Sequence, residues 1–140
     1  MKNIIRQEGL FMPVSQSLIN IIFAEISSKP PISAAMDAVT LIFKDINYSA
    51  ENGGFHPVEI RLISRNDEWY FDYITDFKYM GIDAELEKEI DFSWSQRYVF
   101  LSYTGDLPPG EGQDIFALWQ RNFVHYHFLN AYTPTIKWES

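Results

Sequence analysis

The chain has 140 residues, a length that suits one folded domain, and it has no cysteine, which excludes disulfides, thiolate metal sites and a cysteine nucleophile. Its net charge is −8 and its 11 basic residues are scattered, so it lacks the lysine and arginine clusters with which proteins bind nucleic acids or anionic membrane surfaces. With 11 Phe, 8 Tyr and 4 Trp, the chain is rich in the large rings that fill cores and binding surfaces.

No apolar run approaches the about 20 residues that a membrane-spanning helix needs. The first residues, MKNIIRQEGLFMPVSQS, alternate polar and apolar side chains and lack the long apolar core of a secretory signal. We therefore expect a cytoplasmic protein with no membrane or nucleic-acid partner and a single domain spanning residues 1–140.

The first periodic segment, residues 14–28, predicts a helix. Leu18 and four isoleucines share one face at 100° per residue, and Ser15 can cap the start. Lys29-Pro30-Pro31 ends the segment, since proline cannot continue a helix.

Strands are predicted at 38–46, 57–65 and 69–77, where apolar residues alternate with polar ones. Alternation in the third strand places Tyr70, Asp72 and Asp76 on one face. The segment 84–94 is ambiguous, because it alternates like a strand while residues 84–89 have a helical composition. We expect a strand from about 89 to 94 and another at 97–103, which is apolar on both faces and so should be central in the sheet.

The clearest helix is predicted at 112–132, after a loop at 105–112, and residues 133–140 are expected to form a loosely ordered tail. The predicted fold class is α+β: an antiparallel meander sheet of about five strands, with an N-terminal and a C-terminal helix packed on it.

The stretch ENGGFHPVEIR, residues 51–61, looks most like a site. His56 could act as a general base or metal ligand, with Glu59 or Glu51 as its partner. A structural explanation competes: Gly53 and Gly54 supply positive φ for a turn, Phe55 plugs the core edge and Pro57 starts a strand. The structural explanation is favoured, because such motifs over-predict function.

Carboxylates on neighbouring strands form a second candidate. Asp72 and Asp76 on one strand could face Glu59 and Arg61 on the next, as a binding or glycosidase-like group or, more commonly, as a surface ion-pair row.

Two further groups carry weaker signals. His125 and His127 lie about 200° apart on a helix, so one metal ion cannot bind both. Glu85, Glu87, Glu89 and Asp91 could hold a cation, or imitate a nucleic-acid backbone, or simply keep a strand edge soluble. The chain has no P-loop, no nucleophile elbow and no complete dinucleotide fingerprint.

The strings YSAENGGFHPVEIR (48–61), YITDFKYMG (73–81), ELEKEIDFSW (85–94) and LWQRNFVHY (118–126) resemble an uncharacterised bacterial family, domain of unknown function 2787. The resemblance covers roughly residues 40–130. It implies a small bacterial protein without an assigned activity or known catalytic residues.

We expect a non-enzymatic interaction or binding module that contacts a protein partner, or another copy of itself, without cofactor or metal. The contact would use an aromatic sheet face or a rim pocket near His56, with Phe55, His56, Arg61 and Tyr70 as binding candidates. One alternative is a small hydrolase or metal-dependent enzyme using His56 with Glu59, Asp72 or Asp76. Another is an acidic inhibitor that mimics nucleic acid.

Overall fold

The computed structural model describes Ile5, residues 12–33 and residues 35–140. Within them lie two helices and seven strands. The elements are α1 (Gln16–Ser28), β1 (Ala38–Lys44), β2 (Val58–Arg65), β3 (Glu68–Met80), β4 (Glu85–Ser93), β5 (Tyr98–Leu101), β6 (Gly105–Asp106), α2 (Pro109–Phe128) and β7 (Thr133–Glu139).

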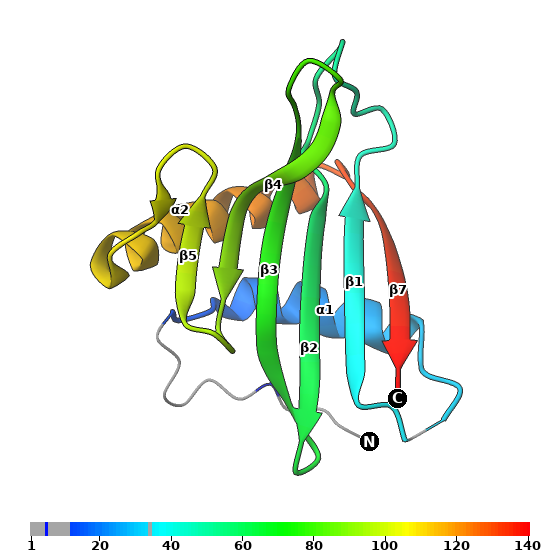
Figure 1. Cartoon of the computed structure of the whole chain (residues 1–140). Helices are drawn as coiled ribbons and strands as arrows, with labels where there is room; N and C mark the ends of the chain where they lie inside the picture. The colour runs from blue at the N-terminus through cyan, green and yellow to red at the C-terminus, as the bar shows by residue number, and fades with distance from the viewer. Residues whose placement is uncertain (1–4, 6–11, 34) are drawn as a thin grey trace.

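The strands form one antiparallel sheet in the order β6-β5-β4-β3-β2-β1-β7. Both helices pack on the same face of this sheet (Figure 1). The predicted fold class, α+β with an N-terminal and a C-terminal helix on an antiparallel meander, is confirmed.

The core lies between the sheet and the two helices. Every second residue of β1 and β2 is buried there, because strand side chains alternate between the two faces. Leu18 and Ile22 of α1 and Phe116 and Phe123 of α2 close the core from the other side. The predicted cap is also present, since the hydroxyl of Ser15 accepts a hydrogen bond from the N–H of Leu18.

Two strand predictions need correction. β4 begins at Glu85 rather than at about residue 89, so residues 85–88 also form a strand although their composition favours a helix. The strand predicted at 97–103 is the shorter β5, and it is not central, because only the two-residue β6 lies beyond it. β6 itself falls in the predicted loop.

The loosely ordered tail predicted at 133–140 is wrong. Residues 133–139 form β7, which pairs with β1 along its whole length and makes the sheet edge. Trp138 connects β7 to the end of α1, because its indole N–H donates a hydrogen bond to the carbonyl of Lys29, 2.9 Å away. Its ring packs against Trp69.

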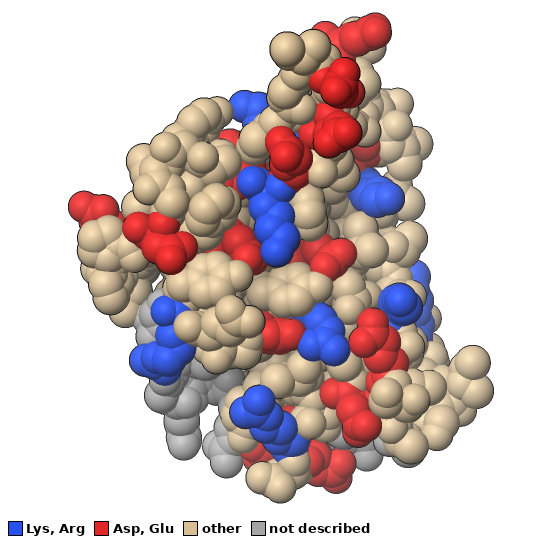
Figure 2. Space-filling view, viewed as in Figure 1, with Lys and Arg blue, Asp and Glu red and all other residues tan. Residues whose placement is uncertain are grey.

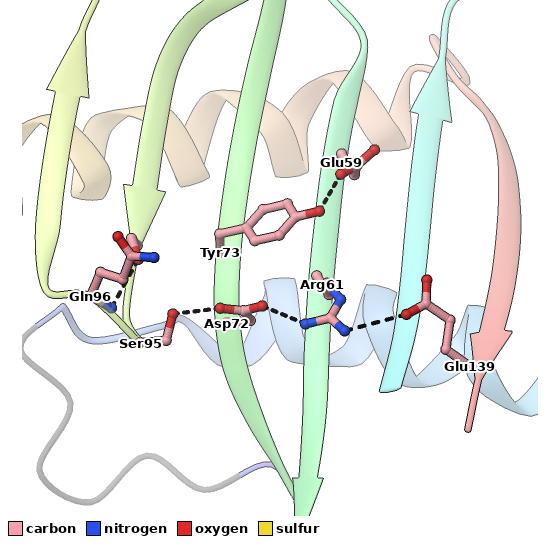
Figure 3. A network of polar contacts seen from close by, with 8 residues as sticks. Glu59, Arg61, Asp72, Tyr73, Ser95, Gln96 and Glu139 are labelled. Carbon is pink, nitrogen blue, oxygen red and sulfur yellow. Dashed lines mark hydrogen bonds and ion pairs between the residues drawn. The ribbon is translucent and has the colours of Figure 1, made fainter. Parts of the chain in front are cut away.

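The face of the sheet away from the helices carries a polar network (Figure 3). Arg61 bonds Asp72 at 2.6 Å and Glu139 at 3.3 Å, and Ser95 donates to the other oxygen of Asp72. Tyr73 donates to Glu59 beside this row. The network links β2, β3, β7 and the β4–β5 turn, so these charges are largely paired with one another.

Replacing Trp138 with Ala should lower the free energy of unfolding by about 2 kcal/mol, because the change removes a half-buried ring and its hydrogen bond. Urea denaturation measures this loss. Lys137→Ala on the same strand is the control, and it should change stability by less than about 0.5 kcal/mol because its side chain is 75% exposed. Equal stability of both variants would contradict the structural role of β7.

Candidate functional site

The loop between β1 and β2 places His56 at the end of the sheet. Gly53 and Gly54 have φ of +68° and +132°, so the predicted need for glycine at these turn positions is confirmed. A Cβ on Gly54 would lie 2.7 Å from a carboxylate oxygen of Asp45, and that same oxygen accepts a hydrogen bond from the N–H of Phe55. Asp45 and Gly54 thus fix the backbone just before His56.

A β-bulge turns Glu89 toward the helices. In the β3–β4 ladder Asp76 pairs with Ile90 and Phe77 pairs with Lys88, so Glu89 has no partner residue on β3. An extra residue in one strand re-aims a side chain in this way. Glu89 and Asp76 therefore both reach the helical side of the sheet, where His56 lies.

Three side chains converge at this point. The Nδ1 atom of His56 lies 2.9 Å from Asp76 Oδ1 and 2.8 Å from Glu89 Oε2. Nδ1 carries one proton at most, and the geometry directs it to Asp76. Glu89 Oε2 therefore accepts no hydrogen bond from the residues that the structure describes, although this carboxylate oxygen is fully buried. The second oxygen of Asp76 accepts the indole N–H of Trp119 at 2.9 Å.

The hydrogen bond with Asp76 raises the pKa of His56 above its usual 6.5. Burial of the ring works in the opposite direction, while the charges of Asp76 and Glu89 add to the increase. The imidazolium form is thus stabilised, and with His56 charged the three side chains together carry one net negative charge.

The cluster forms one wall of a pocket of about 360 Å³ between the sheet and α2. Aromatic side chains form much of the remaining lining: Phe55, Trp119, Phe123, Tyr126 and Tyr132. Burial raises the pKa of the Tyr132 phenol, so this side chain stays neutral at physiological pH. The site therefore combines two carboxylates and an imidazole with an aromatic surface.

An acidic projection lies beside the pocket. Figure 2 shows acidic side chains gathered on the end of the molecule formed by the β3–β4 hairpin and the β1–β2 loop, where Glu51, Asp83, Glu85 and Glu87 are exposed. The projection is connected to the cluster through rings: His56 contacts Tyr48, and Tyr48 stacks on Tyr79. Its charge gives the surroundings of the pocket a negative potential.

Of the catalytic candidates, the structure brings together His56 and Asp76 only. Alternation predicted that Asp72 and Asp76 share a face, and this is wrong: a bulge in β3 places Asp72 in the network of Figure 3, on the face away from the helices. Glu59 lies on that face too, bonded to Tyr73.

The four binding candidates divide in the same way. Phe55 and His56 line the pocket. Arg61 belongs to the network on the other face, and Tyr70 donates to Glu68 at 3.4 Å while its ring lies under Arg65.

The acidic stripe does not form one continuous surface. Glu85 and Glu87 are exposed, Glu89 lies in the pocket, and Asp91 is buried on the opposite face, where Thr75 and Tyr98 donate to it. His125 and His127 lie on α2 as predicted, and the ring of His127 packs edge-on against Phe43.

Sequence reasoning missed Glu89 as a partner of His56 and Trp119 as the donor to Asp76. Strict alternation assigns Glu89 to the same face as Glu87 and Asp91, and the bulge that reverses it has no sequence signal of its own. Trp119 falls within the helix predicted at 112–132, and no role was predicted for it.

Within the described residues, no helix is long and apolar enough to cross a membrane. The family model described as a protein of unknown function (DUF2787) matches residues 16–137. The chain belongs to this family. The resemblance drawn from the sequence is thereby confirmed, and the DUF2787 match extends beyond residues 40–130 to include α1.

Two solved structures from Vibrio cholerae are similar to this DUF2787 chain. One is a hypothetical protein from the VSP-II pathogenicity island, 30% identical, with a TM-score of 0.89 over 98% of this chain and 100% of the other. The second is a conserved hypothetical protein from the pathogenicity island VPI-2, 32% identical, with a TM-score of 0.78 over 96% and 100%; it is described as sharing structural homology with the human P32 protein. No curated protein matches the chain.

The cluster should make stability depend on pH. A histidine whose pKa is raised by folding stabilises the protein fully below its unfolded pKa near 6.5, and this contribution is lost as the pH rises through the folded pKa. Asp76→Asn should lower the pKa of His56, and the stability difference from the wild type should shrink as the pH rises above 6.5. Histidine NMR titration and urea unfolding across pH 5–9 measure both effects.

Asp72→Asn, on the opposite face, is the control and should leave the His56 titration unchanged. A His56 pKa at or below 6.5 in the wild type would contradict the observed pairing.

Proposed function

We propose that this chain is a binding module and that its binding site is the pocket beside His56. The pocket takes up a positively charged group that brings apolar surface with it. The observation that carries this proposal is the position of Asp76 and Glu89 in an aromatic-lined pocket, with a buried oxygen of Glu89 that accepts no hydrogen bond within the described chain.

Charge and ring chemistry both favour a cation. A buried carboxylate oxygen without a donor is costly, and an ammonium or guanidinium group would supply one. Aromatic faces attract cations and cover the apolar part of such a ligand. The exposed acids of the neighbouring projection would raise the local concentration of cations.

The pocket is a better candidate than the sheet face. Among the described residues, the large apolar side chains that are exposed include only one on a strand, Leu86 of β4. The outer face instead carries the paired charges of Figure 3. A protein partner would therefore contact this chain through the pocket, for example by inserting a lysine or arginine side chain.

One alternative has specific support. The His56–Asp76 pair has the geometry of a general base with its orienting carboxylate, which favours a small hydrolase or metal-dependent enzyme. The lining residues include no Ser, Thr, Cys or Lys to act as a nucleophile, although a carboxylate or an activated water could serve. Turnover of p-nitrophenyl acetate or p-nitrophenyl phosphate that Asp76→Asn abolishes would establish the alternative over a pure binding role.

The binding proposal predicts selectivity between two probes of the same shape and opposite charge. With EDTA present, benzamidinium should shift the indole N–H signal of Trp119, which touches Asp76, whereas benzoate should not. Glu89→Gln should lower the affinity for benzamidinium about 10- to 100-fold, which is the contribution of one charge-assisted hydrogen bond to binding. The Trp119 signal is assigned by its loss in Trp119→Phe.

Glu87→Gln is the matched control, since Glu87 lies two residues away on the same strand and is exposed. It should leave the affinity within about twofold, because exposed charges contribute little. Equal binding of both probes, or no binding of benzamidinium, would overturn the proposal.

A further inference from the structure

We propose that His56, Asp76 and Glu89 form a binding site for a divalent first-row transition-metal ion, with open coordination positions that face the pocket. The inference rests on the proposed function in one respect, because the metal ion would be the cation that the pocket takes up. It goes further by naming the three donor atoms: His56 Nδ1, Asp76 Oδ1 and Glu89 Oε2.

The spacing of the donors fits a metal ion. All three atoms lie within 4.8 Å of one another, and Nδ1 lies 2.9 Å and 2.8 Å from the two oxygens. Donors bound at about 2.1 Å lie about 3.0 Å apart at neighbouring octahedral positions and about 3.4 Å apart in a tetrahedral site. The two distances from Nδ1 to the carboxylate oxygens therefore need to change by only a few tenths of an ångström.

The surroundings of the donors also suit coordination. The indole N–H of Trp119 holds Oδ2 of Asp76, which leaves Oδ1 available to the ion, and such outer contacts commonly orient ligating carboxylates. Glu89 Oε2 is buried, lies 2.8 Å from His56 Nδ1 and accepts no hydrogen bond from the described residues. The ion replaces the Nδ1 proton that His56 donates to Asp76 Oδ1, and this proton is released to solvent. The donors come from the end of a fixed loop and two paired strands, and this backbone arrangement preorganises them.

The donor set indicates the class of metal. One imidazole nitrogen with two carboxylates suits Zn²⁺, Mn²⁺, Fe²⁺ or Co²⁺, whereas Mg²⁺ and Ca²⁺ prefer oxygen donors alone. Three protein ligands leave at least one position for water or for a donor atom of a ligand. That position would open onto the aromatic surface of Phe55, Tyr126 and Tyr132.

Isothermal titration calorimetry with Zn²⁺, and with Co²⁺ as a spectroscopic probe, tests the site in the full chain. We expect one Zn²⁺ per chain and visible Co²⁺ absorption from a site that contains nitrogen. Glu89→Gln and His56→Asn should each weaken Zn²⁺ binding by more than about tenfold. The controls Glu87→Gln and His125→Ala, an acid on β4 and a histidine on α2, should bind Zn²⁺ like the wild type.

Each outcome separates the metal site from the general binding proposal. Zn²⁺ binding that competes with benzamidinium supports both. The metal site is overturned if benzamidinium binds and Zn²⁺ does not. It is also overturned if Zn²⁺ binding persists in Glu89→Gln and disappears in His125→Ala. Either result leaves the pocket proposal standing. Zn²⁺ binding at the three donors without benzamidinium binding supports the metal site and overturns the wider ligand proposal. Circular dichroism of each variant confirms that it is folded.

Discussion

Glu89 faces the helices because β4 has one more residue than β3 opposite the Asp76–Phe77 step. Without this bulge, Glu89 would share the outer face with Asp91, and Asp76 would be the only carboxylate beside His56. The bulge therefore creates the negative wall of the pocket. It also places a second carboxylate on the face of the sheet that the helices cover, an arrangement that stability alone does not favour.

The charged side chains on the two faces of the sheet differ in how completely they are paired. On the outer face, Arg61 neutralises Asp72 and Glu139, and Asp91 accepts hydrogen bonds from Thr75 and Tyr98. On the helical face, two carboxylates share one histidine, and one buried oxygen accepts no hydrogen bond within the described chain. Incomplete satisfaction of buried polar groups is costly and is concentrated at functional sites. This contrast is why we propose the pocket, and not the larger network of Figure 3, as the binding site.

Much of the fold could be predicted from periodicity. The two helices and the strands β1, β2 and β3 were predicted close to their observed positions, because burial on one side imposes a regular pattern. β7 was missed because its sequence, TPTIKWE, is short, contains proline and follows the last helix, and only its pairing with β1 makes it a strand. His56 was noticed through the glycines that precede it. Its partner Glu89 could not be found, because a bulge shifts the alternation that sequence analysis depends on.

The structure brings His56, Asp76 and Glu89 together with one donor atom each, all within 4.8 Å of one another. A crystal grown with ZnCl₂ and measured on both sides of the zinc absorption edge tests it most directly. We expect an anomalous peak about 2.1 Å from His56 Nδ1, Asp76 Oδ1 and Glu89 Oε2. A Glu89 side chain that points to the outer face, with no peak beside His56, would contradict it.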